Sequence, residues 1–199
     1  MNNSIELLKR IKLSGISFGE FIKNTDLKLS NIDLLRKNDF ENKLLEYTKL
    51  NQKRTERILK TYKPNDEIIK AISKIDKKQT WLIITEDWCG DSAQNVPYIF
   101  QMTKLNKNID FKIIYRDENL DVIDQYLTNG GRAIPKIIGF DEEGNEVFQW
   151  GPRPETAKLL VKEWKESGLA YSEFSEKLHL WYGKDRGKTV EAEFLALLK

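Results

Sequence analysis

The chain has little of what metal sites and disulfide scaffolds need. Its 199 residues include one cysteine, Cys89, and one histidine, His179. A single cysteine excludes an internal disulfide, and one cysteine with one histidine cannot form a conventional zinc site. No run of 18 apolar residues occurs, so no membrane-spanning helix is predicted. The first residues also lack the pattern of a secretory signal. We therefore expect a cytoplasmic protein without a bound metal.

The formal net charge is only +2, but the charge is unevenly distributed. Residues 1–80 contain 18 lysines and arginines against 11 acidic residues, whereas residues 81–199 contain 15 against 20. We interpret this as two halves that dock on each other. The alternative is that residues 1–80 form a basic arm that binds nucleic acid or a membrane. Since no basic cluster interleaved with aromatic residues supports it, we expect neither partner, and we expect a monomer.

The most informative stretch runs from residue 81 to residue 92. Residues 81–85 form a short apolar, β-branched run that predicts a buried strand, and a helix is expected from Ser92 to about Lys104. Cys89 would then lie where the strand ends and the helix begins. Free backbone N–H groups at a helix start lower a cysteine pKa from about 8.5 towards about 7. Taken alone, a lone cysteine is more often a small buried apolar residue.

The neighbours of Cys89 favour a functional cysteine. Residues 88–92 read Trp-Cys-Gly-Asp-Ser, Pro97 follows inside the expected helix, and residues 132–135 read Arg-Ala-Ile-Pro. A hairpin pattern at residues 140–147 and Gly151 come next. In this order, residues 81–165 resemble the thioredoxin family, whose W-C-G-x-C motif would here carry serine at the second cysteine position.

The resemblance implies an α/β, thioredoxin-like fold with a mixed central β-sheet flanked by helices and an all-helical N-terminal extension. We expect residues 1–78 to form that extension docked on the core. Residues 79–166 would form the thioredoxin-like domain, and residues 167–199 a helical tail that packs on it.

Several local patterns refine this outline. Residues 17–20 have capping-box spacing, whereas residues 24–37 show no clear period and are predicted to be irregular. A long helix is expected over residues 39–62, with Phe40, Leu44, Tyr47, Ile58 and Tyr62 on one face. Asn51, Arg54 and Arg57 form a polar strip on this helix, which we interpret as solvated. Its alternative role is to approach the active site and attract an anionic thiol. In the tail we expect helices over residues 171–182 and 189–198, a loop at 183–187, and a packing or surface role for His179.

The resemblance also implies roles for individual residues. Cys89 would attack a disulfide, and Ile134 and a cis-Pro135 would face it. Trp88, Gly90 and Asp91 would line the substrate groove. Ser92 cannot resolve a mixed disulfide, but it can hydrogen-bond the Cys89 thiolate or cap the helix. Ile83 stands where many thioredoxins carry a buried aspartate that assists the second cysteine, so both parts of that resolving pair are missing.

Three hypotheses follow. The first is a monothiol thiol–disulfide oxidoreductase, in which an accessible and acidic Cys89 forms mixed disulfides with protein disulfides or low-molecular-weight thiols. It would need no cofactor beyond a thiol reductant. The second is a non-redox module that binds a peptide or protein beside Trp88 and Pro135. The third, a carrier that shares an iron–sulfur cluster with glutathione, rests on the resemblance of residues 89–92 to the Cys-Gly-Phe-Ser of monothiol glutaredoxins and ranks lowest.

Overall fold

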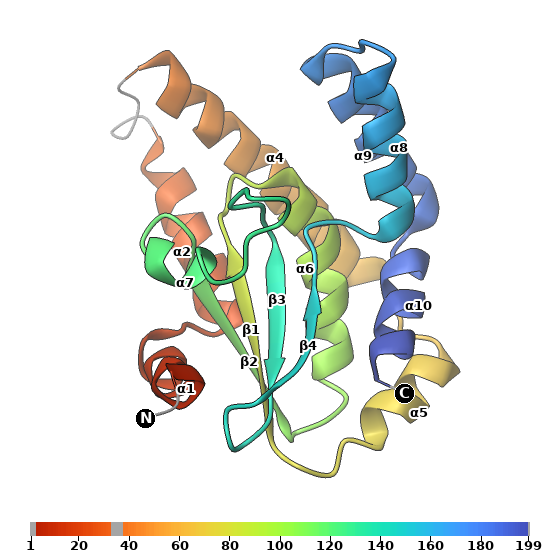
Figure 1. Ribbon diagram of the computed structural model, residues 1–199. Coiled ribbons are helices and arrows are strands. Elements are labelled where there is room, and N and C mark those ends of the chain that lie inside the picture. Colours follow the sequence, from red (N-terminus) through yellow and green to blue (C-terminus); the bar gives the residue numbers. More distant parts are fainter. Residues whose placement is uncertain (1–2, 33–37, 199) are drawn as a thin grey trace.

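A mixed β-sheet organises the molecule in a computed structural model that describes residues 3–32 and 38–198 (Figure 1). Its strands are β1 (Gln79–Thr85), β2 (Ile109–Tyr115), β3 (Lys136–Phe140) and β4 (Glu146–Trp150). Within the described residues their order is β2-β1-β3-β4. β1 pairs parallel with β2 and antiparallel with β3, and β3 pairs antiparallel with β4. The mixed sheet predicted from the sequence is confirmed.

β1 is buried on both faces of the sheet. Because side chains alternate along a strand, Trp81 and Ile83 join one apolar cluster while Leu82 and Ile84 join another. All four side chains are fully buried. This explains why the sequence shows an uninterrupted apolar run here instead of alternation.

Helices cover the two faces unequally. The Trp81 face carries α6 (Gly90–Thr103), whose first turn follows Cys89. It also carries α2 (Phe18–Ser30), α4 (Asp39–Thr61), α5 (Asp66–Ser73) and α10 (Lys188–Leu197). The opposite face is covered by α1 (Asn3–Ser14) and the short α7 (Leu120–Ile123). Two further helices, α8 (Glu155–Glu166) and α9 (Tyr171–Asp185), pack on each other in a third apolar cluster beyond β4 (Figure 1).

The predicted capping box forms at the start of α2. The Ser17 hydroxyl accepts a hydrogen bond from the backbone N–H of Glu20, and the Glu20 carboxylate accepts one from the backbone N–H of Ser17. The irregular segment predicted from residue 24 is wrong as far as Ser30, because α2 continues to that residue. Residues 33–37 lie outside the described residues.

α4 and α5 dock on the core instead of standing apart from it. Ile58, Ile68 and Ile72 are at most 1% exposed and join the cluster beneath the sheet, and α4 packs along α6. The predicted apolar face of α4 is partly wrong, since Phe40 is 70% exposed. The buried side is instead a mixed stripe of Leu45, Thr48, Asn51, Thr55 and Ile58.

This stripe leads to a testable difference between two apolar residues of one helix. We expect Ile58→Ala to lower the free energy of unfolding by about 2–4 kcal/mol, because it removes a fully packed side chain from the core. Phe40→Ala, at the exposed end of α4, should change it by less than about 0.5 kcal/mol. Urea denaturation measures both changes in the free energy of unfolding. Equal losses in the two variants would show that α4 does not dock on the core through Ile58.

The tail departs from the expected pattern at one place. α9 continues through Gly183 to Asp185, where a loop was predicted. The chain then turns at Arg186 and Gly187, which have φ angles of 56° and 82°. A Cβ at Gly187 would lie 2.5 Å from the Tyr98 ring, so the turn towards α10 needs glycine both for its backbone and for its close approach to α6.

Candidate functional site

Cys89 lies at the N-cap position of α6. Its backbone N–H donates to the Glu86 carbonyl at 3.2 Å, and its carbonyl accepts from the Ala93 N–H at 3.1 Å. The thiol donates to the backbone carbonyl of Ile134 at 3.4 Å. The Ile134–Pro135 peptide bond is cis, as predicted. The predicted position of the sulfur, at a strand–helix junction beside the cis-proline, is therefore confirmed.

The predicted accessible and acidic thiol is wrong. Cys89 is 8% exposed, and burial raises the pKa of its thiol to about 11. The negative charge of Asp91 raises the pKa further, while hydrogen bonds from Ser92 and from the backbone at the start of α6 lower it. Desolvation outweighs the helix N-terminus here because distant parts of the chain enclose the site. The resting group is a neutral thiol.

A cavity of about 340 Å³ opens beside Cys89. Its walls come from α4, from the start of α6, from the Ala133–Ile134 segment, from the loop before α8, and from α9. The residues that line it are Leu44, Tyr47, Arg54, Trp88, Cys89, Gly90, Asp91, Ala133, Ile134, Pro152, Arg153, Tyr171, Phe174, Ser175, Leu178 and His179. A volume in this range is typical of small-molecule sites.

Asp91 anchors one wall of the cavity. Its carboxylate receives Nη2 of Arg153 at 2.6 Å and the hydroxyl of Tyr182 at 2.8 Å. Tyr182 in turn accepts a hydrogen bond from the Asn95 amide at 3.1 Å. Nε of Arg153 is buried and has no hydrogen-bond partner among the described residues. Asp91 thus holds Arg153 in place while one guanidinium donor stays free.

The segment that leads into Cys89 is tied to the N-terminal helices. Asp87 pairs with Nζ of Lys28 at 2.8 Å and accepts a hydrogen bond from the Thr48 hydroxyl at 3.0 Å. Its backbone carbonyl accepts from the side-chain amide of Asn51 at 3.1 Å. α2 and α4 therefore fix the strand–helix junction, which explains why polar residues lie on the buried side of α4.

The polar strip of α4 does approach the site, contrary to the preferred interpretation of a solvated face. Asn51 is 3% exposed and accepts a hydrogen bond from Nη1 of Arg54 at 2.9 Å. The guanidinium of Arg54 lies over Gly90, whose missing Cβ would be 3.6 Å from Nη1. Arg57 faces a different cavity, formed with Tyr98 and Arg186.

His179 was predicted to be a surface or packing residue, but it lines the cavity. A Cβ at Gly90 would lie 2.9 Å from its Cε1 and 3.0 Å from its Nε2, so only glycine permits this approach. Nδ1 of His179 lies 3.4 Å from the side-chain amide of Gln94. Burial, followed by Arg54 and Arg153, lowers the pKa of His179 to about 4, so the imidazole is neutral at pH 7.

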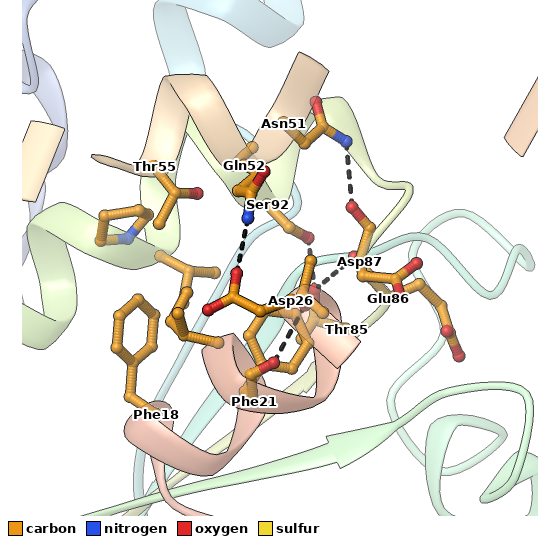
Figure 2. A pocket seen from close by; sticks show the side chains of 15 residues that line it. Phe18, Phe21, Asp26, Asn51, Gln52, Thr55, Thr85, Glu86, Asp87 and Ser92 are labelled. Carbon is orange, nitrogen blue, oxygen red and sulfur yellow. Dashed lines mark hydrogen bonds between the residues drawn. The ribbon is translucent and has the colours of Figure 1, made fainter. Parts of the chain in front are cut away.

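The Ser92 side chain hydrogen-bonds the Cys89 sulfur and also faces the end of β1. Its hydroxyl accepts a hydrogen bond from the Thr85 hydroxyl at 2.5 Å, and it lines a smaller pocket of about 30 Å³ between α2, α4 and α6. Figure 2 shows this pocket, with the Asn51–Asp87 and Gln52–Asp26 hydrogen bonds at its rim. Ser92 thus links the helix start to the end of β1.

The structure brings six of the predicted site residues to one place. Trp88, Cys89, Gly90, Asp91 and Ile134 line the cavity, and Pro135 follows Ile134 directly. The Trp88 ring also packs against the guanidinium of Arg116, whose Cζ lies 4.9 Å from the centre of the ring. Sequence reasoning missed the cavity-lining roles of Arg153, His179 and Tyr171, which come from outside the W-C-G motif. The Pro-Arg-Pro sequence at residues 152–154, next to Gly151, was the only local signal for Arg153.

Two classes of feature are absent from the part of the chain that the structure describes. No group of three or more histidine, cysteine, aspartate and glutamate side chains there could hold a metal ion. None of the helices over residues 3–32 and 38–198 combines the length and apolar character that a membrane crossing requires.

Comparisons with known structures agree with the fold. Two crystal structures resemble the whole chain: a protein of unknown function from Pseudomonas aeruginosa and an HIV epitope scaffold. The first is 18% identical to this chain and has a TM-score of 0.62. The match covers 93% of this chain and 92% of the Pseudomonas chain. The second is 17% identical with a TM-score of 0.59, and 96% of each chain is covered. At this identity they show the fold alone. No curated protein matches.

A family model decides the assignment. The model described as thioredoxin matches residues 37–165, a stretch that includes α4, the sheet, Cys89 and the cis-proline. The match covers more than half of the chain, and the protein belongs to the thioredoxin family.

Proposed function

We propose that the protein is a monothiol thiol–disulfide oxidoreductase that works through Cys89 on small disulfides. The observation that carries this proposal is the position of Cys89, the only cysteine, at the start of α6 beside the cis-proline and on the wall of a cavity. A buried structural cysteine would not need an adjoining space of this size. Small substrates are favoured over folded proteins because α4 and α9 wall in the sulfur.

The chemistry is a pair of exchange steps. The Cys89 thiol first loses its proton to solvent, and the thiolate attacks one sulfur of a disulfide R–S–S–R. The S–S bond of the substrate breaks, a Cys89–S–S–R bond forms, and RS⁻ leaves and takes up a proton. The thiolate of an external thiol R′SH then attacks the R sulfur of the adduct. An R′–S–S–R bond forms as the bond to Cys89 breaks, and Cys89 leaves as a thiolate that takes up a proton. The chain has no second cysteine for that step.

A non-redox binding module is the second candidate, and one observation favours it. The thiol hydrogen-bonds the Ile134 carbonyl and has a raised pKa, so the resting sulfur is a weak nucleophile. In this role the cavity would bind its ligand without covalent chemistry. The iron–sulfur carrier is not proposed further, because a cluster shared between two molecules needs an open sulfur and Cys89 is 8% exposed.

Incubation with a small neutral disulfide tests the proposal. We expect one adduct per chain by intact mass spectrometry, persisting until an external thiol is added. At pH values below the pKa of a thiol, the ionised fraction rises about tenfold with each unit of pH. With a pKa of about 11, the rate of adduct formation should therefore rise about a hundredfold from pH 7 to pH 9. A thiol with a pKa of about 7 would gain only about twofold.

Cys89→Ser is the control and should take up no adduct. Denatured wild-type protein should react at the rate of a free thiol, which shows that the disulfide itself is competent. If folded wild-type protein takes up no adduct even at pH 9, Cys89 is not a working nucleophile and the binding module replaces the proposal.

A further inference from the structure

The walls of the Cys89 cavity carry an excess of positive charge. Arg54 and Arg153 both line it, while Asp91 is the only carboxylate among its described lining residues. Asp91 already pairs with Arg153. Arg54 has no carboxylate partner among the described residues and donates only to the neutral amide of Asn51. One guanidinium charge in the cavity is therefore uncompensated.

Several of the side chains that line this space carry hydrogen-bond donors. Nε of Arg153 is buried and has no hydrogen-bond partner among the described residues. Arg54 donates from one guanidinium nitrogen to the side-chain oxygen of Asn51. Nδ1 of His179 lies 3.4 Å from the side-chain amide of Gln94, and its Nε2 faces Gly90. A buried donor without an acceptor is costly, so Nε of Arg153 and the unpaired charge of Arg54 together favour a ligand that accepts hydrogen bonds.

A second cleft borders the cavity. An outer cleft of about 440 Å³ runs between α4 and α9 and shares Tyr47, Arg54, Tyr171, Ser175 and His179 with the inner cavity. Its outer rim carries Lys43 and Glu176, whose charges offset each other. Arg54 and His179 thus lie at the junction between the cleft and the cavity. Arg54 is therefore placed to contact a molecule in either space.

We propose that the cavity selects a low-molecular-weight thiol or disulfide that carries a carboxylate, with Arg54 and Arg153 as the groups that bind the carboxylate. This inference rests on the exchange chemistry proposed for Cys89 and names its substrate class. Arginine suits the role because its planar fork can donate two parallel hydrogen bonds to one carboxylate. Asn51 is a positioning residue, since it joins Arg54 to the backbone of Asp87 two residues before Cys89.

Three disulfides with similar short chains and different charge test the proposal. They are 3,3′-dithiodipropionate, which is anionic, bis(2-hydroxyethyl) disulfide, which is neutral, and cystamine, which is cationic. Wild-type protein should form the Cys89 adduct fastest with the anionic reagent and slowest with the cationic one. Arg54→Gln should slow the anionic reaction about tenfold and leave the neutral reaction within about twofold, since it removes a charge-assisted hydrogen bond. Arg54→Lys, which keeps the charge, should restore part of the selectivity.

Arg57→Gln is the matched control, because it removes the same charge one turn along α4 from a side chain that faces another cavity. It should leave the order and the rates of the three reagents unchanged. Equal rates for all three reagents with wild-type protein would overturn the anion site and leave the exchange chemistry standing. An equal effect of Arg54→Gln on all three would assign Arg54 a structural role only and would also overturn it.

Binding without chemistry separates the two proposals. Cys89→Ser protein should bind 3,3′-dithiodipropionate in calorimetry and should lose about tenfold in affinity when Arg54→Gln is added. If wild-type protein forms no adduct with any reagent but this binding is found, the anion site stands and the oxidoreductase proposal fails. If neither wild-type nor Cys89→Ser protein distinguishes the three reagents, the anion site is refuted.

Discussion

Ser92→Cys should turn a persistent mixed disulfide into a short-lived one. Cys89 and residue 92 are three positions apart at the start of α6, so two sulfurs there lie about one helical turn apart. The new thiol would attack the Cys89 adduct within the chain, and we expect the adduct lifetime to fall at least about a hundredfold, because the reaction becomes intramolecular. Intact mass spectrometry measures the lifetime after excess disulfide is removed.

Ser92→Ala is the matched control, since it also breaks the hydrogen bond to Thr85 but adds no sulfur. Its adduct should live as long as that of wild-type protein. With a reductant, Ser92→Cys should also reduce small disulfides in repeated turnovers, although slowly, because the fully buried Ile83 offers no assisting acid. An unchanged lifetime in Ser92→Cys would show that the two positions do not form the resolving pair.

A chain that begins at Lys77 should fail to fold. It would lack α4 and α5, whose Ile58, Ile68 and Ile72 are buried against the core. Each buried aliphatic side chain contributes about 1.5–3 kcal/mol, and the total stability of a domain is only about 5–15 kcal/mol. The loss would also uncover one side of α6, which is buried along most of its length.

Circular dichroism and solubility measure this outcome, with the full chain as the reference. Co-production with a separate polypeptide of residues 1–76 should recover soluble protein, because the missing helices can dock from another chain. If the shortened chain unfolds at the same temperature as the full chain, α4 and α5 are dispensable additions and their burial carries little free energy.

The sheet and its hairpin could be predicted because their signals are local. β3 and β4 have the predicted bounds, since β-branched and aromatic residues flank a Glu-Gly-Asn turn. The position of Cys89 followed from a strand, a break and a helix start within 12 residues. The cis bond before Pro135 followed from a family motif.

The environment of Cys89 could not be predicted because it depends on distant segments. α4 comes from the N-terminal third of the chain and α9 from the last 30 residues, and no local pattern shows that they meet over Gly90. The prediction of an acidic thiol considered only the helix N-terminus and left out burial of the sulfur. Burial, followed by the charge of Asp91, reversed the direction of the expected pKa shift. Phe40 shows the same limit, because a helical period identifies a face but not its partner.

The walls of the cavity also differ in when they are made. A ribosome adds residues from the N-terminus, so α4 and the strand–helix junction exist before α9 has been synthesised. Until Tyr171–Asp185 has left the exit tunnel, the cavity lacks the wall that contains His179. On a nascent chain the sulfur lacks this cover until α9 has emerged and docked.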